Sequence, residues 1–111
     1  MKQKEIWLVN LDPTIAAEIK KTRPCVILNS NLIGKLPLKI IAPITDLKVQ
    51  YETVPWMVKL TPDKENNLTK PSAIDLFQVR SVSEKRLIKK IGTIDNKNLK
   101  KCKEALNLVF D

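Results

Sequence analysis

The sequence contains no histidine, and this absence restricts the chemistry that the chain can perform. Histidine is the usual general acid or base near neutral pH, so histidine-based catalytic triads and histidine metal sites are excluded. Any catalysis must use Arg, Lys, Asp, Glu, Thr, Ser or Tyr side chains.

Aromatic residues and cysteines are also scarce. Aromatics make up only 5% of the chain, so isoleucine, leucine and valine must build the core. No apolar run approaches the length that crosses a bilayer, and the first ten residues do not resemble a signal peptide. The spacing of Cys25 and Cys102 suggests neither a zinc site nor a disulfide framework. We expect two buried free thiols in a cytoplasmic protein.

Positive charge, in contrast, is plentiful. The 111 residues carry a formal net charge of +8, and the pI is about 9.6. Such a surplus favours nucleic acid or an acidic protein as the partner, although excess lysine that only solvates the surface is nearly as common. The length suffices for one domain, so we expect a single domain over residues 1–111.

Short apolar runs bounded by turn residues predict a chain made mainly of β-strands. The predicted strands span residues 5–11, 24–29, 38–44, 54–60, 72–80 and 86–94. Pro24 fits only at the first position of its strand, because proline cannot donate to a β-ladder. The segment 72–80 fits either a strand or a strand with a short helical turn.

A helix is predicted at the C-terminus. Asp95 is a good N-cap. Leu99, Cys102, Leu106 and Val109 then recur at spacings of three, four and three, which makes one apolar stripe on a helix of about four turns. The predicted fold is therefore α+β, mainly β: a small barrel or compact sheet with the C-terminal helix packed on it.

A polar loop over residues 12–23 is unusually long for so small a domain, which suggests a function. Its charged members are Asp12, Glu18, Lys20, Lys21 and Arg23. Arg23 stands between this loop and a buried strand, and its planar guanidinium suits phosphate. An ion pair between Arg23 and Glu18 or Asp12 is an equally good interpretation.

Four other residues are weaker candidates. The Thr45 hydroxyl suits a phosphate or a ribose, but a Thr-Asp pair that starts a turn is the more common role. Glu18 could serve as a base or neutralise a neighbouring cation. Gln78 and Arg80 share one face of a predicted strand, where solvated side chains are more common than ligand contacts.

Several short segments, in the same order along nearly the whole chain, resemble the MazF/PemK family of toxins. The first is a strand that ends in Asp12-Pro13, followed by a loop with Glu18, then Arg23-Pro24 and an apolar strand. The others are Ala42-Pro43-Ile44-Thr45, Asp75-Leu76-Phe77-Gln78-Val79-Arg80, Ile91-Gly92-Thr93-Ile94 and Leu106-Asn107-Leu108-Val109. Each match is weak alone, but together they are specific.

The resemblance implies a fold, an activity and partners. The fold is a small SH3-like barrel with helices (the CcdB/MazF/PemK fold), usually as a homodimer. The activity is that of a type II toxin–antitoxin toxin: ribosome-independent, sequence-specific cleavage of single-stranded RNA, especially mRNA, with no cofactor or metal. The partner is an acidic antitoxin whose flexible segment occupies the RNA groove.

The resemblance also assigns roles to residues. Arg23 and Thr45 match the catalytic arginine and threonine, and Glu18 matches a loop glutamate implicated in some members. The predicted RNA-binding residues are Asp12, Lys20, Lys21, Gln78 and Arg80. One departure concerns the loop, where Ala16-Ala17 replaces the usual Gly-Ser. This replacement predicts a stiffer loop with one polar contact fewer.

A metal-independent reaction follows as a hypothesis. The ribose 2′-hydroxyl attacks the adjacent phosphate, leaving a 2′,3′-cyclic phosphate and a 5′-hydroxyl. Arg23 stabilises the charge and Thr45 positions the reacting groups. Two alternatives are a CcdB-type toxin that poisons DNA gyrase by binding it, and a catalytically silent module that binds RNA or an antitoxin. The Arg23-Pro24 and Ile44-Thr45 matches favour the nuclease.

Overall fold

A computed structural model describes the whole chain, residues 1–111, and contains seven strands and one α-helix. The strands are β1 (Glu5–Asn10), β2 (Thr22–Ile27), β3 (Leu38–Asp46), β4 (Met57–Leu60), β5 (Ser72–Asp75), β6 (Arg80–Ser83) and β7 (Leu87–Thr93). The α-helix is α1 (Asn96–Phe110). Four single turns of 3-10 helix are η1 (Asn31–Ile33), η2 (Val49–Tyr51), η3 (Leu76–Gln78) and η4 (Glu84–Arg86).

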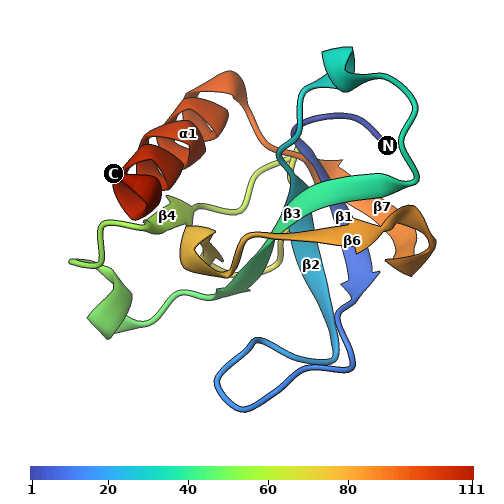
Figure 1. The fold of residues 1–111 in the computed structure, drawn as a ribbon. Helices are drawn as coiled ribbons and strands as arrows, with labels where there is room; N and C mark the ends of the chain where they lie inside the picture. The colour runs from blue at the N-terminus through green and yellow to red at the C-terminus, as the bar shows by residue number, and fades with distance from the viewer.

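All strands belong to one antiparallel sheet with the order β4-β5-β3-β2-β1-β7, to which β6 is added by pairing with β3. The long strand β3 connects the sheet: it pairs with β2 on one side, and with β6 and then β5 on the other. Figure 1 shows β1, β2, β3, β6 and β7 wrapped together, with β4 and α1 on the other side of the molecule.

The second half of β2, residues 25–27, is buried on both faces, which explains its continuous apolar run. Val26 points into a core cluster that also contains the buried residues of α1, whereas Cys25 and Ile27 point into a second cluster. Strands β1, β2, β3, β6 and β7 each contribute side chains to this second cluster, as expected for a small barrel. The predicted fold, a mainly β barrel with a C-terminal helix packed on it, is confirmed.

The structure moves the starts of two predicted strands by two and three residues. Strand β2 begins at Thr22, so Pro24 is its third residue; pairing with β3 starts only at Cys25, and the proline therefore lies beyond the end of that ladder. Strand β4 begins at Met57 rather than at residue 54. In the segment 72–80, β5 followed by η3 confirms the alternative of a strand with a short helical turn, whereas β6, which begins at Arg80, was not predicted.

Helix α1 begins as predicted. The Asp95 carboxylate accepts a hydrogen bond from the Asn98 N–H at 2.7 Å, which caps the first turn. Leu99, Cys102 and Ala105 are its buried residues. The helix is neither long enough nor apolar enough to cross a membrane.

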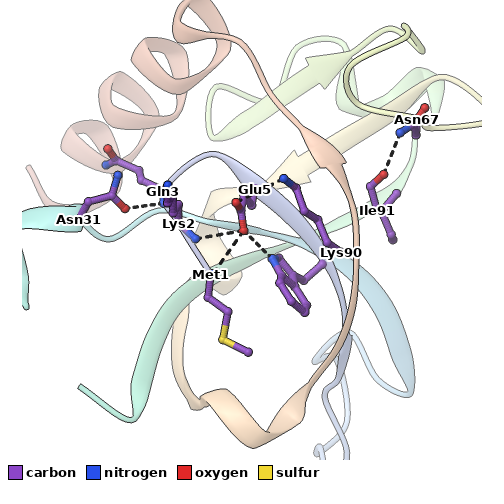
Figure 2. A network of polar contacts seen from close by, with 9 residues as sticks. Met1, Lys2, Gln3, Glu5, Asn31, Asn67, Lys90 and Ile91 are labelled. Carbon is purple, nitrogen blue, oxygen red and sulfur yellow. Dashed lines mark hydrogen bonds and ion pairs between the residues drawn. The ribbon is translucent and has the colours of Figure 1, made fainter. Parts of the chain in front are cut away.

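A polar network ties the start of β1 to β7 (Figure 2). The Glu5 carboxylate accepts hydrogen bonds from the Trp7 indole at 2.9 Å and the Lys2 N–H at 3.0 Å, and it lies 3.4 Å from the Lys90 ammonium. Burial alone would raise the pKa of Glu5, but these hydrogen bonds and positive charges outweigh it and lower the pKa from 4.5 to about 2.

Candidate active site

The fold brings Arg23 and Thr45 to one place. Cys25 of β2 lies opposite Pro43 of β3, and this register continued by two residues leads to Arg23 and Thr45. The β2–β3 ladder ends at the Cys25–Pro43 pair, so Arg23 and Thr45 lie beyond it and are not joined by backbone hydrogen bonds. Both line a hollow of about 250 Å³, which we call the Arg23 hollow. Its lining residues are Arg23, Pro24, Ile44, Thr45, Asp46, Leu68, Thr69, Lys70 and Ser72.

The Arg23 guanidinium has no carboxylate partner. Its only protein hydrogen bond runs from Nε to the Lys20 carbonyl at 3.4 Å. The Asp12 carboxylate instead accepts from the Lys21 N–H at 2.9 Å, and the Glu18 carboxylate accepts from the Ile15 N–H. The alternative of an ion pair within the loop is therefore wrong, and the terminal nitrogens of Arg23 are free for an anion.

A second cation lines the Arg23 hollow. The Lys70 ammonium lies 3.3 Å from the Asp46 carboxylate, and the two side chains are 66% and 61% exposed. Such an exposed pair contributes at most about 1 kcal/mol, so a phosphate can compete for Lys70. Sequence analysis missed Lys70 because it belongs to the loop before β5, which only the tertiary structure brings next to β2.

Glu18 lies in a neighbouring hollow of about 380 Å³, the Gln78 hollow. Its lining residues are Leu11, Ala17, Glu18, Ile19, Pro43, Phe77, Gln78, Val79 and Arg80. Pro43 lines this hollow, and Thr45, two residues along β3, lines the other. Of the three predicted catalytic residues, the structure therefore places Arg23 and Thr45 in one hollow and Glu18 in the adjacent hollow.

Two predicted RNA-binding residues hold the β1–β2 loop, residues 11–21. The Gln78 side-chain oxygen accepts from the Ile19 N–H at 2.6 Å, and Arg80 Nη1 donates to the Leu11 carbonyl at 3.3 Å. Arg86, which sequence analysis missed, donates to the carbonyls of Asn10, at 3.1 Å, and Asp12. Its position in η4 gave no sequence signal for this contact.

The remaining charged residues of the loop either stabilise its conformation or are exposed to solvent. Asp12 organises the loop itself, through the Lys21 N–H and the Thr14 hydroxyl. Lys20 and Lys21 are exposed and are separated from Arg23 by Thr22 alone. Ala16, at the position where glycine was expected, has φ of +51°, a left-handed conformation that glycine adopts more easily.

The cysteines are unsuited to chemistry at this site. Burial raises the pKa of the Cys25 thiol to about 12, although the positive charge of Arg80 opposes the shift. Burial likewise raises the pKa of Cys102 to about 12. Both thiols are free and buried, as predicted. No group of three or more cysteine, aspartate or glutamate side chains is arranged to hold a metal ion.

Known proteins match this chain over nearly its full length. The sequence profile of the PemK-like, MazF-like toxins of type II toxin–antitoxin systems matches residues 2–110. Endoribonuclease EndoA of Bacillus subtilis is 27% identical over 109 residues, which cover 97% of this chain and 92% of that protein. Endoribonuclease MazF of Staphylococcus saprophyticus is 28% identical over 109 residues, with 97% and 89% covered.

Solved structures share the fold. MazF from Deinococcus radiodurans superposes with a TM-score of 0.82 at 17% identity, with 99% of this chain and 96% of that chain covered. An endoribonuclease from a mycobacterial species, solved in complex with its cognate antitoxin, gives a TM-score of 0.77 at 14% identity, with 99% and 94% covered.

Proposed function

The chain belongs to the PemK-like, MazF-like toxins of type II toxin–antitoxin systems, and on this premise we propose that it is an endoribonuclease that cleaves single-stranded RNA. The observation that carries the proposal is the Arg23 hollow, where an arginine without a carboxylate partner shares one polar space with Thr45. The relatives EndoA and MazF are both endoribonucleases by name, which supports the same activity.

The proposed reaction is a transesterification within the RNA. The 2′-hydroxyl oxygen bonds to the adjacent phosphorus, the bond to the 5′-oxygen breaks, and the products are a 2′,3′-cyclic phosphate and a 5′-hydroxyl. Arg23 stabilises the negative charge that develops on the phosphate oxygens and supplies the proton to the leaving 5′-oxygen. Thr45 positions the phosphate through its hydroxyl.

Glu18 is the proposed acceptor of the 2′-hydroxyl proton. Its carboxylate is held by the Ile15 N–H of the same loop, so this hydrogen bond must break and the Glu18 side chain must turn before it can face the Arg23 hollow. We assign the RNA path to the two hollows along β3. Lys20 and Lys21 would contact phosphates on this path, and the remaining proposed RNA-binding residues are Asp12, Gln78 and Arg80.

We further infer the partners and the setting. The net charge of +8 suits RNA and an acidic antitoxin alike, and a relative was solved with its cognate antitoxin. A homodimer is proposed; the exposed apolar side chains of Leu32, Ile33, Leu36 and Leu38 are a surface that a second copy would cover. Residues 1–111 would form one toxin domain in the cytoplasm, where mRNA is present and thiols stay reduced.

The test is cleavage of a long single-stranded RNA by the purified protein, followed by analysis of the product ends. We expect cyclic phosphate and 5′-hydroxyl ends, no loss of cleavage in EDTA, and no cleavage at a 2′-deoxy residue. Arg23→Ala and Thr45→Ala should each slow cleavage ~100-fold to 1000-fold, which is typical for losing one stabilising donor. Lys97→Ala on α1 removes the same charge away from both hollows and should cleave at the wild-type rate.

Other results would overturn the proposal. Wild-type rates in both Arg23→Ala and Thr45→Ala would refute the assignment of the site. Inhibition of gyrase supercoiling without RNA cleavage would instead establish a toxin that acts by binding.

A further inference from the structure

Asp75 is a buried carboxylate that neither the proposed reaction nor an ion pair explains. It is 6% exposed, lies at the end of β5, and has no cationic partner. A buried charge is costly unless hydrogen bonds satisfy it. One oxygen accepts from the Phe77 N–H at 3.1 Å and caps η3, whereas the other accepts from the Gln78 side-chain nitrogen at 3.0 Å.

The second hydrogen bond fixes which way the Gln78 amide points. A carboxylate can only accept, so the amide nitrogen must face Asp75 and the amide oxygen must face the opposite side. On that side the Ile19 N–H, which can only donate, meets the oxygen at 2.6 Å. Only one orientation of the amide satisfies both neighbours, and Asp75 sets it.

Ile19 joins the far end of the β1–β2 loop to the barrel, two residues before Lys21, whose carbonyl accepts from the Leu11 N–H at 2.9 Å. Its side chain packs against the barrel core, and its N–H is bound by Gln78. The near end of the loop is held separately, by Arg80 and Arg86 at the carbonyls of residues 10–12. Between these two ends the loop carries Glu18, and it continues through Lys20 and Lys21 to Arg23.

We propose that Asp75 is a positioning residue that acts through Gln78 to hold the β1–β2 loop, and with it Glu18, beside the Arg23 hollow. The role in RNA cleavage rests on the proposed function, whereas the hold on the loop does not. The alternative role of Asp75 is only to cap η3.

The isosteric variant Asp75→Asn separates the two roles. Asparagine caps a helical turn as well as aspartate does, so its oxygen can keep the bond from the Phe77 N–H. Its amide nitrogen then faces Gln78, whose amide must turn over and present a nitrogen to the Ile19 N–H. Two donors cannot bond, so we expect the Ile19 amide hydrogen to exchange about tenfold faster in the free protein, measured by NMR.

A double variant supplies the rescue. Gln78→Glu alone puts a second carboxylate against Asp75 and should also speed exchange about tenfold. In the double variant Asp75→Asn, Gln78→Glu, the amide nitrogen at position 75 donates to one carboxylate oxygen at position 78, and the other oxygen accepts from the Ile19 N–H. Exchange should return to within about twofold of wild type, a strong departure from additivity.

Cleavage of RNA gives an independent readout. We expect kcat/KM of Asp75→Asn to fall about fivefold, whereas Asp95→Asn, which removes a charge from the cap of α1 away from both hollows, leaves it unchanged. Unaltered Ile19 exchange in Asp75→Asn, or additive effects in the double variant, would overturn the inference. Faster exchange with unchanged kcat/KM would refute the role in the reaction. A wild-type protein that cleaves no RNA would refute the proposed function and leave the hold on the loop standing.

Discussion

Gly92→Ala tests whether β7 and the loop before β5 are packed as tightly as the structure indicates. A Cβ added to Gly92 would lie 2.5 Å from the carbonyl oxygens of both Glu65 and Asn66. These are backbone atoms, and the Asn66 side chain anchors them: it is 2% exposed and bonds to the backbone of residues 61, 63 and 68. Displacing these two carbonyl groups is therefore energetically costly.

The cost follows from the contacts that must open. Relief of the clash separates loop and strand by about 0.9 Å, because ordinary Cβ contacts begin at 3.4 Å. That shift breaks the bonds from the Thr93 N–H to the Glu65 carbonyl and from the Asn67 side chain to the Ile91 carbonyl, both 2.9 Å long; the second appears in Figure 2. Overpacking at about 1–3 kcal/mol and two hydrogen bonds at about 1 kcal/mol each give a loss of roughly 3–5 kcal/mol.

Thermal unfolding followed by circular dichroism measures this loss. We expect Tm to fall by roughly 10–20 °C, the range that follows for a domain of about 100 residues. The loop also carries Thr69 and Lys70 into the Arg23 hollow, so RNA cleavage should fall as well.

The chain's other glycine is the matched control. Gly34 has open space around its Cβ position, but its φ of +90° and ψ of −162° lie in a region that is essentially open to glycine alone, so Gly34→Ala should cost about 1–3 kcal/mol through backbone conformation. Equal stability losses in the two variants, or a Tm of Gly92→Ala within about 3 °C of wild type, would refute the packing argument.

Three further predictions concern the loop, the β1 network and the thiols. Ala16→Gly should stabilise the chain by about 0.5–1 kcal/mol in urea unfolding, because φ of +51° is strained for alanine; a destabilised variant would contradict this conformation. Glu5 has a pKa lowered to about 2 in the folded chain, so its stabilisation is complete above pH 4.5 and is lost as the pH falls toward 2. The stability difference between wild type and Glu5→Gln should therefore be about 1–2 kcal/mol at pH 7, after allowance for solvent screening, and vanish near pH 2; a difference independent of pH would refute the assignment. With thiol pKa values of about 12, Cys25 and Cys102 should resist a thiol reagent at pH 8 until guanidinium unfolds the chain, and rapid labelling of the native protein would contradict their burial.

Local patterns in the sequence determined most of the fold. Short apolar runs bounded by turn residues located six of the seven strands, and Asp95 with its apolar stripe located α1, because each of these signals lies within one segment of the chain. The family resemblance selected Arg23 and Thr45 as partners. The composition excluded histidine chemistry, and its surplus of positive charge favoured nucleic acid or an acidic protein as the partner.

The tertiary structure decided what depends on contacts between distant segments. Strand β6 was missed because four residues hold too little pattern to identify a strand, and its pairing with β3 creates it. Asp75 and Gln78 were part of a match to the family, but only the folded chain reveals that one orients the other toward Ile19, 59 residues away from Gln78. Lys70 and Arg86 gave no signal at all, since a surface cation acquires its role from the backbone and charges that folding places beside it.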